Sequence, residues 1–376
     1  LQNRKVSFQE KITLITQGVA DENIVTMCLI FLVAGGFSKA VDMAGGVEST
    51  VNLGLSIMPP NVAVAGLFVI SCFISVSMGT SMGTIAAMAP IAVGISDKAG
   101  VGMAVCAGAV MGGAMFGDNL SMISDTTIAA VRTQGAEMKD KFRENFLIVL
   151  PAAVITVILF LIVPGSGQGA SFEGLEYNVL KILPYLVVLI GALIGINVFV
   201  VLISGIVLSL LVGVGTGAIA PTEIFQVVGD GVTSMYDITV ISIVVAFIVS
   251  LVRAHGGIQY ILVKIKKRVR GKRGGELGIA LLVLLVECCS ANNTVAIVMS
   301  GPIARNISEE YGISPRRSAS LLDIFASVGQ GLIPYGAQLL SAASLTGLTP
   351  FQILPYMYYP VLMAVSALLF IFLRKR

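Results

Sequence analysis

The chain alternates long apolar stretches with short polar interruptions, and the apolar stretches are long enough to cross a membrane. A spanning helix needs about 20 predominantly apolar residues. Runs near this length, which do not alternate as barrel strands do, occur at 24–43, 146–163, 180–195, 197–213, 236–253 and 351–373. Because lipid tolerates only helices and closed barrels as spanning structures, we predict an all-α integral membrane protein.

Four further apolar regions carry glycine or polar residues at their centre. Residues 61–96 and 277–308 each consist of two apolar arms around a tip that is rich in Ser, Thr or Asn. Each region is short for two full crossings, which predicts a re-entrant helical hairpin. Residues 100–131 and 317–347 each predict a transmembrane helix that is interrupted half-way.

These features occur twice in the same order, which predicts an internal duplication. The segment Pro90-Ile-Ala-Val-Gly-Ile-Ser96 resembles Pro302-Ile-Ala-Arg-Asn-Ile-Ser308. Two weaker matches align Gly45-Gly46 with Gly256-Gly257, and Gly112, Ser124 and Thr127 with Gly329, Ser341 and Ser344.

The duplication predicts a division of the chain into two halves. We expect a first repeat at 24–163 and a second at 214–373, separated by an outer loop and a scaffold helix pair at 164–213. Residues 1–23 are expected to form a cytoplasmic segment before the first crossing. The scaffold pair has no counterpart in the first half, so we expect about two further helices upstream of the sequence.

Composition and charge give the orientation. The chain is 56% hydrophobic and 12% charged, against about 25% charged residues in soluble domains. Basic residues mark the cytoplasmic side, and they cluster at 1–23, 132–145, 264–273 and 305–317 and at the C-terminus. This assignment requires each hairpin to return to the side from which it entered, so the two repeats have inverted topology. We predict a multi-pass protein of the inner (plasma) membrane with a cytoplasmic C-terminus.

The orientation also accounts for the basic run 264–273, which we do not interpret as a nucleic-acid site. Contact of this run with anionic lipid head groups is an expectation. The five cysteines lie in apolar runs with no metal-binding spacing, so we expect no bound cofactor and neither a disulfide nor a zinc site.

The interrupted stretch Gly112–Thr127, GGAMFGDNLSMISDTT, contains two carboxylates, Asp118 and Asp125. Charged groups at membrane depth are costly and mark functional sites. Hard cations take oxygen ligands, and Asn119 and Ser121 add neutral oxygens beside the two aspartates. We predict a binding site for a hard cation here. The alternative is that the aspartates cap the two half-helices.

The two hairpin tips supply further neutral oxygen donors at predicted helix breaks. Their residues are expected either to complete the ion site or to cap the returning helices. They are Thr80, Ser81 and Thr84 in the first tip, and Asn292, Asn293 and Thr294 in the second.

Two more carboxylates are candidate proton sites. Glu287 precedes the second tip by three residues, and the alternative role is a structural hydrogen bond. Asp323 lies in the second interrupted helix, and the alternative is an ion pair with Arg305, Arg316 or Arg317.

The segment Phe116-Gly-Asp-Asn-Leu-Ser-Met-Ile-Ser-Asp-Thr-Thr127 resembles the signature of the NhaC-type sodium/proton antiporters, within the wider ion transporter superfamily. The resemblance implies scaffold and transport subdomains and sodium/proton exchange, and therefore sodium as the cation bound at Asp118 and Asp125. The mechanism that we expect is competition of cation and proton for buried carboxylates, whose pKa is raised by desolvation, with alternating access. Inverted repeats with broken helices are typical of such secondary active transporters.

Two other functions are considered. The nearer is a Na⁺- or H⁺-coupled transporter of an amino acid or small carboxylate, because helix N-termini at the tips favour an anion. The remote one is an intramembrane aspartyl protease, suggested by Tyr236-Asp237 and Phe116-Gly-Asp118, although that family carries these elements in the opposite order. We expect a transporter rather than an enzyme, and consider a homodimer as its assembly.

Overall fold

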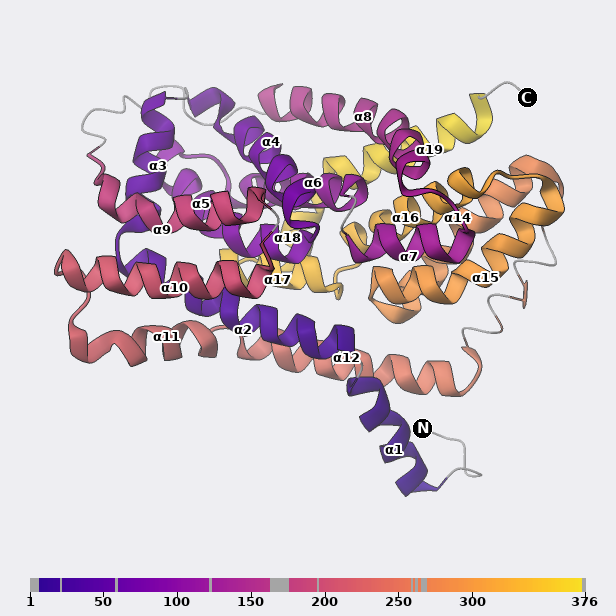
Figure 1. The fold of residues 1–376 in the computed structure, drawn as a ribbon, viewed down its shortest axis with the longest axis horizontal. Coiled ribbons are helices and arrows are strands. Elements are labelled where there is room, and N and C mark those ends of the chain that lie inside the picture. The colour runs from indigo at the N-terminus through magenta and orange to yellow at the C-terminus, as the bar shows by residue number, and fades with distance from the viewer. Residues whose placement is uncertain are drawn as a thin grey trace.

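The computed structural model describes residues 7–20, 22–57, 60–121, 124–162, 176–194, 196–257, 260, 263–264 and 269–373, and every regular element in these ranges is a helix (Figure 1). The first half contains α1 (Phe8–Val19), α2 (Glu22–Met43), α3 (Gly46–Ile57), α4 (Pro60–Met78), α5 (Ser81–Ala99), α6 (Met103–Leu120), α7 (Asp125–Gln134) and α8 (Met138–Ile162). The second half contains α9 (Val179–Leu193), α10 (Val198–Gly215), η1 (Pro221–Glu223), α11 (Ile224–Thr233), α12 (Tyr236–Ala254), α14 (Gly271–Ser290), α15 (Asn293–Tyr311), α16 (Pro315–Leu332), α17 (Ala337–Thr346), α18 (Pro350–Ile353), η2 (Leu354–Tyr356) and α19 (Tyr358–Leu373). The predicted all-α class is confirmed.

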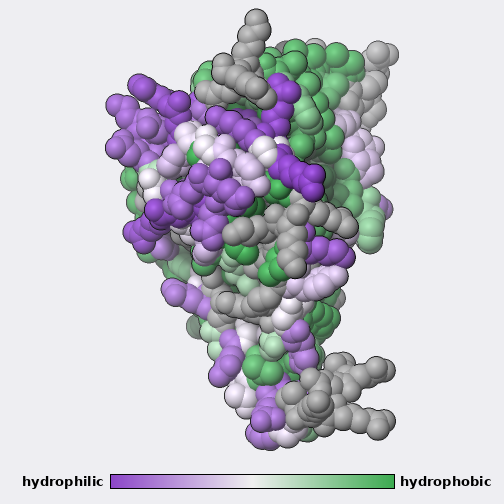
Figure 2. Space-filling model, turned by 90° about the vertical axis from the view of Figure 1, so that its right-hand side faces the viewer, coloured by the Kyte–Doolittle hydropathy of each residue, from purple (hydrophilic) through white to green (hydrophobic). Residues whose placement is uncertain are grey.

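Among the described residues, three helices are long and apolar enough to cross a membrane, or four if one bent pair counts as a single span. The three are Ile24–Met43, Met103–Leu120 and Met138–Ile162, and the pair formed by Pro350–Tyr356 and Tyr358–Leu373 bends by 51°. Figure 2 shows hydrophilic side chains over much of one end of the molecule and hydrophobic side chains along its flank. This distribution is typical of a helical bundle whose flank faces lipid and whose ends face water.

Two helical hairpins approach the middle of the protein from opposite ends (Figure 1). The first pairs α4 with α5 and turns at Gly79, and the second pairs α14 with α15 and turns at Ala291. Gly79 has φ 68° and Ala291 has φ 50°, and Ala291 is the non-glycine residue with positive φ among the described residues. The two tips therefore use the same backbone conformation, which L-residues with a Cβ seldom adopt.

Two interrupted helices lie between the hairpins and run in opposite directions (Figure 1). The first is α6 followed by α7, and the second is α16 followed by α17. Helix α7 packs against α15 and α16, while α17 packs against α5 and α6. Each repeat thus contributes its second half-helix to the hairpin of the other repeat, and this exchange joins the two repeats into one structure of inverted symmetry.

The two repeats correspond at a constant spacing of 212 positions. This spacing separates the starts of α5 and α15 (81 and 293), of α6 and α16 (103 and 315) and of α7 and α17 (125 and 337). It also relates the left-handed glycines that end these helices, Gly100 with Gly312 and Gly135 with Gly347. The predicted match of Gly112 with Gly329 is wrong by five positions, because small residues recur so often here that a false register matches as well as the true one.

Three regions contain more helix than the apolar runs predict. Residues 44–60, which lie between two apolar runs, contain helix α3, and residues 214–235 contain η1 and α11. Helix α8 begins at Met138, eight residues before the predicted crossing at 146, because its first two turns are polar. The expected loop at 164–178 lies mostly outside the described residues.

Small residues allow the central helices to approach closely, as is common in membrane bundles. A Cβ atom added to Gly113 of α6 would lie 2.4 Å from the Phe68 carbonyl oxygen of α4, and one added to Gly117 would lie 2.2 Å from Ser75 Cβ. Helices α2 and α11 approach equally closely, because a Cβ atom added to Gly35 of α2 would lie 2.2 Å from the Gly231 carbonyl oxygen of α11. These glycines are required by packing.

We expect Gly113→Ala to destabilise the protein, since its new methyl group would meet backbone atoms of α4 and overpacking costs about 1–3 kcal/mol. The matched control is Gly229→Ala in α11, where nothing lies within 4 Å of the added atom and helix propensity favours alanine by about 0.5–1 kcal/mol. Thermal denaturation of the detergent-solubilised protein, followed by size-exclusion chromatography, should shift in opposite directions for the two variants. Equal midpoints would contradict the packing of α4 on α6.

Candidate ion-binding site

The two hairpin tips and the two helix breaks meet at one cavity of about 250 Å³. Helix α2 closes one side of it with Glu22, Thr26 and Ile30. The polar residues that line the remainder come from both repeats: Thr80, Ser81, Asp118, Ser124, Thr126, Asn292, Asn293, Thr294, Gln330 and Gln338. Residues more than 200 positions apart in sequence therefore share one polar space inside an apolar protein.

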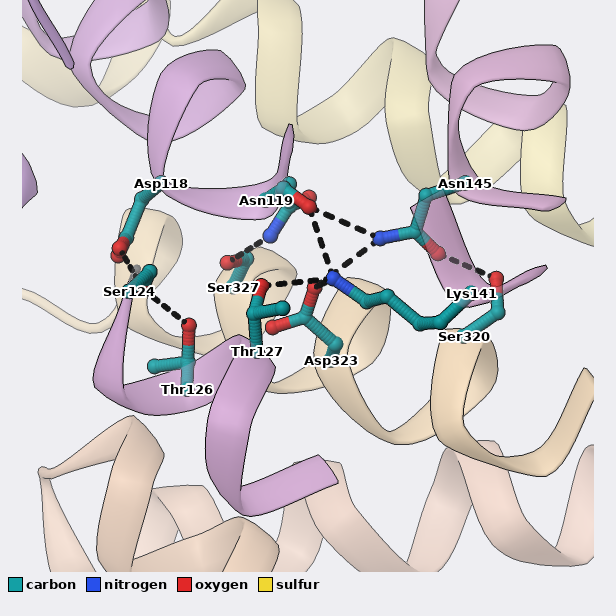
Figure 3. Close-up of polar contacts among 10 residues, drawn as sticks. All are labelled: Asp118, Asn119, Ser124, Thr126, Thr127, Lys141, Asn145, Ser320, Asp323 and Ser327. Carbon is teal, nitrogen blue, oxygen red and sulfur yellow. Dashed lines mark hydrogen bonds and ion pairs between the residues drawn. The ribbon is translucent and has the colours of Figure 1, made fainter. Parts of the chain in front are cut away.

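Asp118 provides a carboxylate of this cavity. It lies in the last turn of α6 and is 5% exposed. Ser81 Oγ donates to its Oδ2 at 3.2 Å, and Ser124 Oγ donates to its Oδ1 at 2.5 Å. Ser124 Oγ also lies 2.9 Å from Thr126 Oγ1 (Figure 3). The carboxylate thereby holds together the first hairpin, the end of α6 and the start of α7.

Helix N-termini surround the cavity. Helices α5, α7 and α17 start after Thr80, Ser124 and Gly336, and none of the three has a side-chain cap. Helix α15 differs, because Asn292 Oδ1 accepts a hydrogen bond from the Val295 N–H at 3.0 Å. The capping alternative is therefore confirmed for Asn292 and wrong for Thr80. Free helix N-termini carry partial positive charge, which balances the charge of Asp118.

A chain of polar contacts connects the second hairpin to Asp118. The side-chain amide of Gln330 contacts that of Gln338, whose Nε2 donates to Ser81 Oγ at 3.2 Å. When the Gln330 amide is turned so that its nitrogen faces α14, it donates to Glu287 Oε1. Glu287 is fully buried, and its Oε2 has no hydrogen-bond partner among the described residues. Gln330, Gln338 and Ser81 thus lie in line between the two carboxyl groups, and the Gln330 amide nitrogen donates either to Gln338 or to Glu287.

A second polar cluster lies directly beside the cavity, around the buried ammonium group of Lys141 (Figure 3). Its Nζ donates to Asp323 Oδ2 at 2.5 Å, to Thr127 Oγ1 at 2.8 Å and to the Asn119 carbonyl oxygen at 2.8 Å. Asn119 belongs to the last turn of α6 and Thr127 to the first turn of α7. Lys141 therefore bridges the break in the first interrupted helix and attaches it to α16.

Asn145 extends this cluster one turn further along α8. Its Nδ2 donates to Asp323 Oδ2 at 3.0 Å, and its Oδ1 accepts from Ser320 Oγ at 2.5 Å. Asn119 Nδ2 donates to Ser327 Oγ at 2.5 Å. Each contact joins the first repeat to α16, so the cluster fixes the position of the residue next to Asp118.

The predicted ion pair of Asp323 with an arginine is wrong. Arg317 instead contacts Glu144 and Glu276, with shortest distances of 3.3 Å to each, nearer the start of α16. Asp323 lies two turns further along the helix, beyond the reach of that cluster, and pairs with Lys141.

The structure brings together only part of the set of residues predicted from sequence. Asp118, Thr80, Ser81, Asn292, Asn293 and Thr294 line the cavity. Thr84 Oγ1 donates to the Thr80 carbonyl oxygen, and Asn119 and Ser121 are buried outside the lining. The side chain of Asp125 lies outside the described residues, and its backbone begins α7.

Three residues of the site, Gln330, Gln338 and Lys141, were not predicted from sequence. The correct repeat spacing would have identified the first two, because it places Gln330 at the position of Asp118 and Gln338 at that of Thr126. Lys141 was counted only among the basic residues of 132–145 that mark the cytoplasmic side. It shares a buried helical face with Asn145 and Ile148, and this spacing of three to four residues is the signal that could have revealed it.

Comparison with known proteins identifies the family. The family model described as "Na+/H+ antiporter family" matches residues 2–164 and 171–374. The chain belongs to the Na⁺/H⁺ antiporter family. Members of this family are secondary active transporters of the membrane, so this antiporter is a transport protein rather than an intramembrane protease.

Relatives of this antiporter carry several different names. The chain is 24% identical to the Na(+)/H(+) antiporter NhaC of Alkalihalophilus pseudofirmus, over 87% of this chain and 78% of the relative. It is 22% identical to the malate-2H(+)/Na(+)-lactate antiporter of Bacillus subtilis, over 88% and 77%. It is 24% identical to the arginine/ornithine antiporter ArcD of Halobacterium salinarum, over 89% and 76%. The solved YdaH transporter of Alcanivorax borkumensis matches with a TM-score of 0.48 at 12% identity, over 97% of this chain and 89% of that chain.

Removing one partner of the buried Lys141–Asp323 pair should destabilise the antiporter strongly. Lys141→Met and Asp323→Asn each leave a buried charge without its partner, which costs about 3–5 kcal/mol. The double variant removes both charges and should recover much of the loss in thermal denaturation of the purified protein. Lys139→Met, at an exposed position of the same helix, serves as control. Additive losses in the double variant would show that the two groups do not interact.

Proposed function

We propose that this antiporter exchanges Na⁺ for H⁺ at the cavity formed by the hairpin tips and the helix breaks. The observation that carries the proposal is the buried carboxylate of Asp118, which accepts hydrogen bonds from Ser81 and Ser124 at the junction of both repeats. A carboxylate with neighbouring hydroxyl and amide oxygens is the donor set that a hard cation prefers. Since the same carboxylate also accepts a proton, the two ions compete for it.

The cation ligands in this proposal are Asp118 and the oxygen-bearing residues of the two tips. Asp125 supplies the second carboxylate of the site in this proposal, because it directly follows Ser124 at the start of α7. Asn119, Ser121 and Thr84 support the site from outside the cavity. Glu287 is a proton site that the chain through Gln330 couples to Asp118, while Asp323 serves to hold Lys141.

Alternating access follows from the arrangement of the two repeats. The site lies between hairpins that enter from opposite ends, so movement of the hairpins against the outer helices would open the cavity to one side at a time. We place the protein in the plasma membrane with its C-terminal end in the cytoplasm, on the basis of the basic segments. A homodimer stays a prediction.

Asp118→Asn should abolish exchange, because an amide can neither release a proton nor neutralise a bound cation. Exchange is measured in proteoliposomes as the Na⁺-dependent dissipation of a pH gradient, with a pH-sensitive dye. Asp97→Asn, at an exposed position near the end of α5, is the matched control and should retain the wild-type rate. A wild-type rate in Asp118→Asn would rule out this carboxylate as the exchange site.

A second candidate is a Na⁺- or H⁺-coupled antiporter of a small organic carboxylate or amino acid. The uncapped N-termini of α5, α7 and α17 favour it, because their partial positive charge attracts a carboxylate. Relatives named as malate/lactate and arginine/ornithine antiporters support a small organic carboxylate or amino acid as the transported solute.

The two candidate functions differ in whether Na⁺ alone is sufficient to dissipate the pH gradient. For Na⁺/H⁺ exchange, addition of Na⁺ to proteoliposomes should dissipate the pH gradient fully in the absence of organic solutes. Malate, lactate, arginine and ornithine, added singly, should then leave the rate unchanged. A rate that depends on one of these solutes, together with uptake of the labelled solute, would favour the second candidate.

A further inference from the structure

A basic cavity of about 810 Å³ lies at the start of α14 and α16, at the opposite end of both helices from the ion site. Its lining includes Arg270, which directly precedes α14, and Lys272 and Arg273 of that helix. Helix α16 contributes Arg316 and Arg317. Glu276 is the acidic residue of the lining. The walls of the cavity are therefore strongly positive.

The positive charge of this cavity is only partly neutralised. Arg317 is held by Glu144 and Glu276, and Arg316 Nε lies 4.0 Å from Glu144 Oε2. Within the described part of the chain, Arg270, Lys272 and Arg273 form no ion pair. Both helices also start here without a side-chain cap. Cations at helix N-termini oppose the helix dipole, so the arrangement favours binding of an anion.

An apolar groove of about 470 Å³ adjoins the basic cavity between α8 and α19. Its lining includes Leu147, Pro151 and Leu373, and Glu144 belongs both to this lining and to the cluster around Arg317. Leu147 is 60% exposed and Leu373 is 72% exposed. The groove therefore opens on the outer surface of the helices, next to the positive cavity.

We propose that one anionic phospholipid binds here, with its phosphate in the basic cavity and an acyl chain in the groove. Guanidinium and ammonium groups bind phosphate oxygens through charge-assisted hydrogen bonds, and the two free helix N-termini add N–H donors. The apolar groove distinguishes a lipid from a free phosphate ion. The lipid contacts α8, α14, α16 and α19, and it joins both repeats at this end of the protein.

The proposal is tested by native mass spectrometry of the delipidated full chain, titrated with phosphatidylglycerol, phosphatidylcholine or glycerol 3-phosphate. Wild type should prefer phosphatidylglycerol to both other ligands. A basic residue near a lipid surface contributes about 1 kcal/mol, or about fivefold in affinity. Lys272→Ala/Arg273→Ala should therefore weaken phosphatidylglycerol binding at least about tenfold.

Two further variants make the test specific. Lys139→Ala/Arg143→Ala removes two exposed basic residues at the start of α8 that do not line the cavity, and it should leave the affinity within about twofold. Leu147→Asn should weaken phosphatidylglycerol binding without changing that of glycerol 3-phosphate. Equal losses in the two double variants would overturn the site. Binding of glycerol 3-phosphate as tight as that of phosphatidylglycerol would show a phosphate site in place of a lipid site.

Discussion

Helix breaks inside a membrane leave backbone N–H and C=O groups without partners, and each such group is costly in hydrocarbon. The rest of this structure depends on how that constraint is met. The breaks are gathered at the centre, where side chains and not lipid surround them. At the first break, the Lys141 ammonium group donates hydrogen bonds to the Asn119 carbonyl oxygen and to Thr127 Oγ1 on the other side of the break. At the second hairpin tip, Asn292 caps the returning helix.

The two repeats share a backbone but not a charge distribution. At the 212-residue spacing, Asp118 corresponds to Gln330, and Glu287 corresponds to Ser75. Of the two acids on either side of Gln330 and Gln338, the first repeat therefore carries one on its broken helix, and the second repeat carries the other on its hairpin. Ser75 Oγ donates to the Ala114 carbonyl oxygen, while Glu287 contacts Gln330. A symmetric scaffold therefore holds an asymmetric site, in which two amides separate the two acids.

Much of the fold could be predicted from sequence, because hydrophobic run length and glycine-rich interruptions are local properties. The hairpin tips at 80–84 and 292–294 and the break after Asp118 were placed in this way. The helix start at Met138 was missed, since polar residues at a helix end look like a loop until their buried face is known. The register of the second broken helix was wrong because small residues repeat too often to define an alignment.

The sequence by itself determined that this is a helical membrane transporter with two repeats, and that Asp118 lies at a break in hydrocarbon. These properties depend on composition, periodicity and a local motif. Only the tertiary structure decided which residues meet: Ser81 with Asp118, Gln330 with Glu287, and Lys141 with Asp323. The last of these pairs lies 182 positions apart in the chain. The physical reason is that the energy of a buried charge depends on its neighbours in space, which the order of residues along the chain does not specify.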